Sequence, residues 1–174
     1  EIVQCLLTHA HLDHVMGVAW VFEKWGVLPR LHPTDDVTWE QAPKAAQLYG
    51  VSMDVLPERG LDLEEHGSWV VCGTHRLELR CAPGHSAGHV VFVNHEQGWV
   101  IGGDVLFQGS VGRTDLPGGD GAVLAASIEN QLFSLPDAFE VWPGHGPSTT
   151  VGSEKTSNPY VNAQGTGMLQ REGV

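Results

Sequence analysis

Long apolar runs, basic residues and closely spaced cysteines are all scarce in this sequence. No apolar run reaches the roughly 20 residues that a membrane-spanning helix requires, so we expect no membrane association. Nine Lys and Arg stand against 21 Asp and Glu, and the net charge of -12 would repel a phosphate backbone. We therefore expect no nucleic-acid partner. The three cysteines lack CxxC spacing and lie in apolar stretches, which favours a reduced, cytoplasmic protein.

The length of the chain and its content of apolar residues suit a single globular domain. The chain has 174 residues, 41% of them apolar, which is enough for one substantial core over residues 1–174. Because Glu1 is followed at once by the apolar run 2–7, the chain opens just before a core strand. We expect an N-terminal piece of the domain to be missing. The sequence leaves the oligomeric state open.

Short apolar or alternating stretches predict the strands. These stretches cover residues 2–7, 69–72, 76–81, 90–93, 99–101 and 139–142. The stretches 90–93 and 99–101 are continuously apolar, which is typical of strands covered on both faces. Helical stretches lie between the strands, so we predict an α/β fold with two sheets face to face and helices outside.

Apolar residues at helical spacing predict the helices. One helix is expected at 15–24, and the side chains turned inward are expected to be Met16, Ala19 and either Trp20 or Phe22. A second is expected at about 35–49, capped by Thr34 or Asp35 and kinked or divided at Pro43. The stripe of a third is marked by Leu124, Ile128, Leu132 and Leu135.

The strongest chemical signal is the segment 8–14, Thr-His-Ala-His-Leu-Asp-His, between the first strand and the first helix. Residues two apart in an extended segment point the same way, so His9 and His11 can bind one cation together. Asp13 and His14 point apart as the chain turns into the helix, which suits a second cation. A solvated polar loop is the alternative for this motif taken alone.

Three further strands end in a possible ligand beside a glycine. His85 follows Gly84, Asp104 follows Gly103, and His145 follows Gly144. Functional groups are usually placed on loops held by a rigid sheet, and glycine keeps the space around a ligand open. With segment 8–14 these residues supply five His and two Asp, which is enough for two cations. Imidazole with carboxylate suits zinc, iron or manganese, and we favour zinc.

This motif set resembles the metallo-β-lactamase superfamily, and within it the glyoxalase II branch, over essentially the whole chain. Residues 9–14 match the HxHxDH signature of that superfamily. The resemblance implies a two-metal hydrolase lacking its first N-terminal strands. It implies that metal 1 is held by His9, His11 and His85, metal 2 by Asp13, His14 and His145, and both by Asp104.

The segments 103–107 and 109–119 resemble a narrower subgroup, the small YcbL-like glyoxalase II-type hydrolases. This resemblance implies a small-molecule thioester substrate, specifically a hydroxyacylglutathione. Only 29 residues follow His145, so we expect no counterpart of the helical domain that grips glutathione in full-length glyoxalase II. Arg113 can either orient its own loop by pairing with Asp115 or bind an anionic substrate. Lys155 and Asn158 are further candidate substrate-binding residues, expected to line the mouth of the pocket.

The expected reaction is hydrolysis, with Asp13 and Asp104 as the catalytic carboxylates. Two cations sharing a water would lower its pKa from about 15.7 toward 7, so hydroxide would be available to attack the thioester. A thiolate leaves readily, so no general acid is needed. The alternatives are a persulfide dioxygenase with a single iron, a β-lactamase, a nuclease of the same fold and a non-catalytic metal-binding or redox-partner module.

Overall fold

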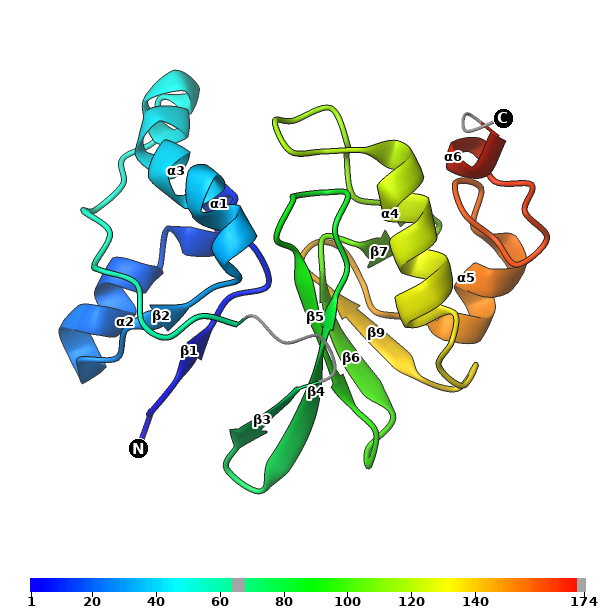
Figure 1. Ribbon diagram of the computed structural model, residues 1–174, viewed down its shortest axis with the longest axis horizontal. Coiled ribbons are helices and arrows are strands. Elements are labelled where there is room, and N and C mark those ends of the chain that lie inside the picture. The colour runs from blue at the N-terminus through cyan, green and yellow to red at the C-terminus, as the bar shows by residue number, and fades with distance from the viewer. Residues whose placement is uncertain (64–67, 172–174) are drawn as a thin grey trace.

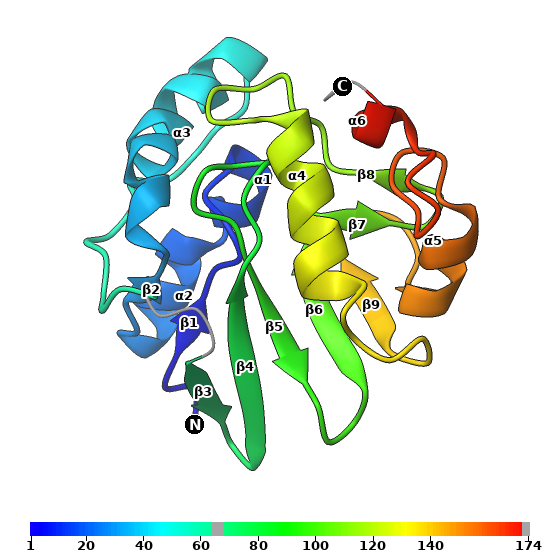
Figure 2. The same ribbon diagram turned by 45° about the vertical axis from the view of Figure 1, so that its right-hand side comes forward.

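The computed structural model of the chain describes residues 1–63 and 68–171 and is built around a six-stranded mixed sheet (Figures 1 and 2). In spatial order its strands are β10 (Thr149–Thr150), β9 (Glu140–Pro143), β6 (Trp99–Gly103), β5 (Val90–Asn94), β4 (His75–Cys81) and β3 (Trp69–Cys72). Neighbouring strands are antiparallel except for the parallel pair β6 and β9. Five strands predicted from the sequence are confirmed with small shifts at their ends.

The N-terminal part of the chain forms a second, smaller layer. β1 (Cys5–Leu6) pairs in parallel with β2 (Pro29–Arg30), so only part of the predicted strand 2–7 is extended and paired. Three helices accompany this pair, namely α1 (Leu12–Val15), α2 (Val18–Trp25) and α3 (Asp36–Tyr49). A single 3₁₀ turn, η1 (Pro33–Asp35), leads into α3. The predicted α/β class is confirmed.

Two details of the predicted helices are wrong. The helix expected at 15–24 is broken at residues 16–17, and this break changes the direction in which the following residues point. Val15 and Val18 are therefore buried, whereas Met16, Trp20 and Phe22 are 38%, 53% and 40% exposed. The second helix, α3, is not divided at Pro43. Pro43 lies on its exposed face, where water can satisfy the carbonyl that proline leaves without a donor.

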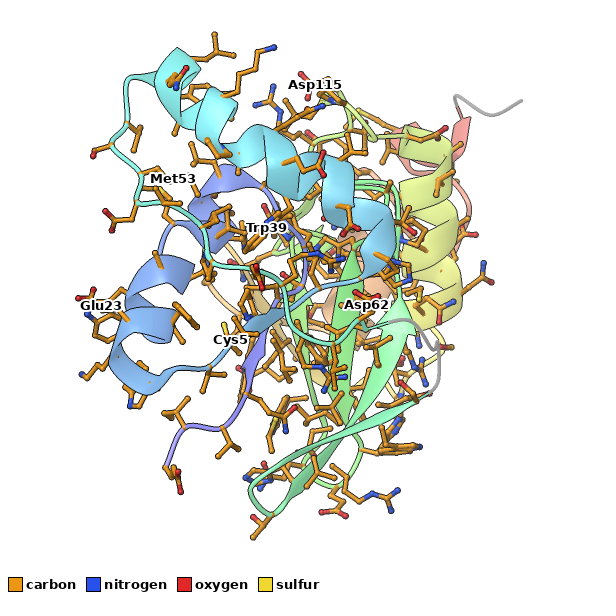
Figure 3. All side chains as sticks on the ribbon, turned by 60° about the vertical axis from the view of Figure 1, so that its left-hand side comes forward. Cys5, Glu23, Trp39, Met53, Asp62 and Asp115 are labelled. Carbon is orange, nitrogen blue, oxygen red and sulfur yellow. The ribbon has the colours of Figure 1, made fainter. Side chains whose placement is uncertain are left out.

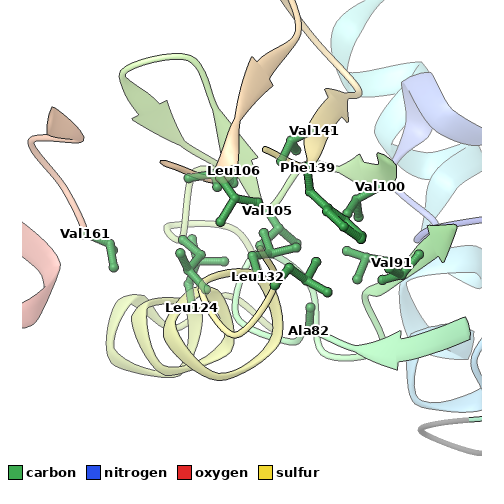
Figure 4. Close-up of a cluster of buried hydrophobic side chains, with 14 of the residues drawn as sticks. Ala82, Val91, Val100, Val105, Leu106, Leu124, Leu132, Phe139, Val141 and Val161 are labelled. Carbon is green, nitrogen blue, oxygen red and sulfur yellow. The ribbon is translucent and has the colours of Figure 1, made fainter. Parts of the chain in front are cut away.

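Three groups of buried apolar side chains hold the layers together. One group, which includes Val15, Leu31 and Trp39, lies between the β1–β2 pair and α1–α3, the side of the molecule shown in Figure 3. The second joins Leu6 of β1 to one face of the large sheet, including Phe92 of β5. The third lies on the opposite sheet face and includes Val91 of β5 (Figure 4). Alternate residues of β5 thus serve different cores.

Helix α4 (Gly121–Ser127) covers the second sheet face together with a π-helical turn, η2 (Ile128–Leu132). Asp120 caps α4, since its carboxylate accepts a hydrogen bond of 3.0 Å from the backbone N–H of Val123. The predicted apolar stripe is confirmed, because all four of its members are buried: Leu124, Ile128, Leu132 and Leu135. The C-terminal segment adds α5 (Val151–Ser157) and α6 (Met168–Arg171).

The sheet topology brings the ends of several strands to one edge. β6 and β9 run in parallel, so residues 104 and 144–145 follow at the same end. β4 and β5 are antiparallel, and their connection 82–89 turns at that end too. The segment that leaves β1 joins this edge through a hydrogen bond of 2.8 Å from Val90 N to Thr8 O. A short hairpin of β7 (Leu106–Phe107) and β8 (Ser110–Val111) follows β6.

Within the described ranges, no helix combines the length and the apolar character needed to cross a membrane.

We predict that Leu124→Ala will lower the free energy of unfolding by about 2–5 kcal/mol, because it leaves a cavity between α4 and the sheet. Urea denaturation measures this loss. The neighbouring Val123→Ala is the control, since Val123 is 41% exposed and its replacement should change the stability by less than about 0.5 kcal/mol. Equal losses in the two variants would contradict the assignment of this core.

Candidate metal centre

The sheet edge described above gathers all seven residues that the sequence singled out as ligands. They form three overlapping groups whose potential ligand atoms lie within 4.8 Å of one another. The groups are His9, His11 and His85; His9, His14 and Asp104; and Asp13, His14 and His145. The prediction that segment 8–14 and three strand-end loops meet at one place is therefore confirmed.

His9 and His11 face the same side of their segment, as extended spacing predicts. Their ring centroids are 4.9 Å apart, and His11 Nδ1 lies 2.8 Å from His85 Nε2. Two of the three histidines come from the segment after β1 and the third comes from the β4–β5 connection. The group therefore spans both layers of the fold.

Asp104 lies at the centre of the cluster. Its Oδ1 is 3.3 Å from His14 Nε2, and its Oδ2 is 3.6 Å from His85 Nε2 and 3.4 Å from His145 Nε2. Asp13 lies at the solvent side, with Oδ2 2.9 Å from His145 Nε2. A carboxylate between two groups of imidazoles is in a position to be shared by two cations.

The cluster contains buried polar atoms that have no hydrogen-bond partner among the described residues and could bind a cation. His9 Nε2 is buried and has no hydrogen-bond partner among the described residues, although a buried polar atom without a partner costs free energy. A Cβ on Gly144 would collide with Asp104 Oδ1 and would come within 2.7 Å of the His14 ring. Glycine thus keeps space open beside the carboxylate. The donor set of imidazoles and carboxylates fits divalent zinc, iron or manganese.

The environment keeps three of these imidazoles in the neutral form that binds metals. Burial, reinforced by neighbouring histidines, lowers the pKa of His9 well below its usual range and the pKa of His11 to about 4. Burial also lowers the pKa of His85. In His14 burial again lowers the pKa, but contact with Asp104 outweighs it and the net shift is upward. The pKa of Asp104 itself is lowered by His14, His85 and His145 against the effect of its burial.

A layer of hydrogen bonds orients the candidate ligands. The carbonyl oxygen of Arg113 lies 2.8 Å from His85 Nδ1, which leaves Nε2 to face the cluster. His89 Nε2 accepts a hydrogen bond of 3.0 Å from the backbone N–H of Asp104, and the His89 ring stacks on His9 with centroids 4.6 Å apart. His89 is fully buried.

Asp35 is a supporting residue that the sequence analysis missed. The sequence predicted its side chain only as a possible helix cap, but this side chain accepts no capping hydrogen bond from the backbone of α3. It is fully buried and accepts three hydrogen bonds: 2.8 Å from Ala10 N, 3.0 Å from Ser86 Oγ and 2.8 Å from Gly88 N. One carboxylate thus ties the segment of His9 and His11 to the loop of His85. Only the tertiary structure shows this, because the partners lie 25 to 53 residues away in sequence.

The structure does not bring Lys155 and Asn158 to the pocket mouth. Lys155 Nζ bonds to Asp137 Oδ1 at 2.7 Å and to Leu135 O at 3.1 Å. Asn158 is fully buried, and its Nδ2 donates to Ser110 O and to Glu154 Oε2. Both therefore hold the C-terminal segment in place, and we do not propose them as substrate-binding residues. The buried Glu154 accepts a hydrogen bond from Gly109 N and so braces the β7–β8 hairpin.

Arg113 does line a pocket of about 710 Å³ that opens beside the cluster. Its guanidinium makes two bonds of 2.7 Å to the carboxylate of Asp115, as one of the two expectations for it proposed. One wall of the pocket comes from α3 and the opposite wall from residues 107–117, which Figure 1 shows facing α3 across the molecule. Five of the candidate ligands also line this pocket, namely His11, Asp13, His85, Asp104 and His145.

We predict that Asp35→Asn will weaken metal binding about 10- to 100-fold, the usual effect of removing a group that orients ligands. The amide presents an N–H₂ group where the carboxylate accepts hydrogen bonds from two directions, so the two loops can no longer both be held. Competition with a chromogenic chelator measures the affinity, and circular dichroism reports the fold.

The matched control is Asp36→Asn. This neighbouring carboxylate forms an ion pair of 2.7 Å with Arg59 instead of contacting the metal-site loops. Its replacement should leave metal affinity unchanged. Equal metal affinity in the Asp35→Asn variant and the unmodified protein would show that the buried carboxylate does not position the ligands.

Comparison with known proteins agrees with this geometry. Residues 1–148 match the family model of the metallo-beta-lactamase superfamily. The chain is 40% identical over 162 residues to hydroxyacylglutathione hydrolase GloC of Haemophilus influenzae, covering 91% of this chain and 76% of that protein.

Two solved structures are also similar. The crystal structure of TTHA1623 in a di-iron-bound form has a TM-score of 0.85 and 43% identity, covering 92% of this chain and 78% of that chain. The BLEG-1 B3 metallo-beta-lactamase has a TM-score of 0.82 and 36% identity, covering 91% and 77%. The sheet topology, the clustered His and Asp residues and these matches together establish that the chain belongs to the metallo-beta-lactamase superfamily of metal-binding hydrolases.

Proposed function

We propose that this chain hydrolyses thioesters, with a hydroxyacylglutathione such as S-lactoylglutathione as substrate, at a centre that holds two divalent metal ions. The observation that carries the proposal is the position of Asp104 between two sets of imidazoles beside an open pocket. The similarity of this chain to a protein named hydroxyacylglutathione hydrolase supports the choice of substrate.

The proposed ligands follow from the three groups of side chains. His9, His11 and His85 would hold one metal, Asp13, His14 and His145 the other, and Asp104 both. We propose zinc for both positions, and the same donors also suit iron or manganese. When bound, such ions supply Lewis acidity and lower the pKa of a water molecule toward 7.

The chain's own residues would then handle protons and position the substrate. Asp13 is the exposed carboxylate of the cluster, so its Oδ2 can accept a proton from a water in the pocket and release it to solvent. Asp104 is mostly buried, and His89 holds its backbone, so it fixes the spacing of the two sets of imidazoles. The apolar walls of the pocket limit the water around the substrate.

The leaving group explains why a thioester suits this pocket. Cleavage of an ester of a poor leaving group requires an acid that protonates the departing oxygen, whereas a thiolate with a pKa near 8.5 departs unprotonated. Among the described residues that line the pocket, every imidazole and carboxyl group belongs to a candidate ligand. A leaving group that departs without being protonated therefore suits this pocket.

The deciding experiment measures metal content and activity on one preparation. We expect about two metal ions per chain and release of free thiol from S-lactoylglutathione, abolished by a chelator and restored by zinc, iron or manganese. KM should be high, because Arg113 is the one cation besides histidines among the described lining residues, and it is already paired with Asp115. Oxygen consumption with glutathione persulfide, without thiol release from any thioester, would establish the dioxygenase instead. Hydrolysis of a chromogenic lactam alone would establish a β-lactamase.

We also predict that Asp104→Ala will lower the metal content to below one ion per chain, because it removes a carboxylate that both metals share. Elemental analysis of the purified variant measures this directly. Asp54→Ala, which removes an exposed carboxylate outside the cluster, should keep the full metal content. If the Asp104 variant still held two ions, Asp104 would not bridge them.

A further inference from the structure

The walls of the pocket are less polar than the cluster of candidate ligands that also lines it. On the side of α3, the apolar lining includes Ala45 and Val51, and Met16, which follows α1, lines the pocket too. On the opposite side, it includes Phe107, Val111 and Leu116. Apolar residues outnumber the uncharged polar residues of the walls, which are Thr38, Gln41, Tyr49 and Ser110. The candidate metal ligands thus lie beside a groove whose walls are mostly hydrocarbon.

Away from the candidate metal ligands, the charge on the groove walls is balanced. Among the described residues that line it, Arg113 is the one cation apart from the histidines of the metal cluster. Both guanidinium contacts of Arg113 go to Asp115 at 2.7 Å, so its charge is already matched. Lys155 is bound to Asp137 and does not line the groove. A glutathione group carries two carboxylates, and outside the metal cluster the described lining residues offer them no cationic side chain without an acidic partner.

We propose that the groove recognises an uncharged, apolar group of the thioester, and that the glutathione portion contributes little to specificity. This inference rests on the proposed thioester hydrolysis and names the class of substrate that the site selects. The group would be an alkyl or aryl chain on either side of the thioester bond, lying between α3 and residues 107–117. Each methylene that leaves water in such a groove improves binding by up to about fourfold.

A binding experiment tests this without any turnover. The probes are non-hydrolysable thioethers, S-methyl, S-butyl and S-hexyl, made with glutathione and with uncharged N-acetylcysteamine. Calorimetry on the metal-loaded protein should show affinity rising with alkyl length in both series. At equal length the two carriers should agree within about threefold, whereas equal affinity of the methyl and hexyl compounds would overturn the proposal. So would glutathione compounds that bind more than tenfold tighter than their uncharged counterparts.

Variants locate the alkyl group in the groove. Ala45→Asp places a charge on the α3 wall and should remove most of the gain from methyl to hexyl, while the methyl compounds bind as before. Val51→Asp tests the same wall at a second position, in case the first variant does not fold. The control is Leu48→Asp, because Leu48 is 78% exposed on the same helix and does not line the groove. A gain from alkyl length that persists in both groove variants would contradict the assignment.

Hydrolysis assays test the groove separately from the proposed function. They also show on which side of the thioester bond the apolar chain lies. Hexanoyl-S-N-acetylcysteamine carries the chain on the acyl side, and S-hexyl thioacetate carries it on the thiol side. A higher kcat/KM for one of them than for the matching short thioester supports the groove and names the side. Cleavage of S-lactoylglutathione without any gain from either chain would overturn the groove alone. Length-dependent binding with no thioester cleaved would refute thioester hydrolysis and leave the groove standing.

Discussion

The site depends on one constraint, which is that its ligands come from two layers of the fold that must be held at a fixed distance. His9 and His11 belong to the layer of β1 and α1–α3, whereas His85 and Asp104 belong to the large sheet. Imidazole and carboxylate ligands bind a cation only within a few tenths of an ångström of the correct distance. The buried carboxylate of Asp35 meets this requirement by bonding to the backbone of both loops.

Three further hydrogen bonds also hold the candidate ligands and the pocket wall in place. His89 holds the backbone of Asp104, the carbonyl of Arg113 orients His85, and Glu154 braces the hairpin that forms one wall of the pocket. Each of these groups is fixed by hydrogen bonds to atoms distant in sequence. The candidate ligands are thus held from outside the cluster, and His9 Nε2, which has no hydrogen-bond partner among the described residues, remains available to a cation.

The placement of chemistry at the sheet edge also explains how one fold can serve several reactions. The positions of the ligands follow from strand ends, which the sheet fixes, whereas the groove walls come from α3 and the loop 107–117. Changes in these walls alter which groups can enter without moving the cluster. For this chain the walls are mostly apolar, and this is the basis of the proposal that substrate choice rests on hydrocarbon contacts more than on ionic ones.

The residue types of the candidate ligands and the strand ends that carry them could be predicted from the sequence, because both are local properties. The spacing of His9 and His11 sets their common direction, and the apolar runs before His85, Asp104 and His145 identify the strands. The polar residues that support the site could not be predicted in this way, because their partners come from distant parts of the chain. Asp35 and His89 are buried by segments far away in the chain. Lys155 bonds to Asp137, 18 residues away, and Asn158 to Ser110, 48 residues away. The exposure of Met16, Trp20 and Phe22 could not be predicted either, because a two-residue break before α2 set the direction of the whole helix.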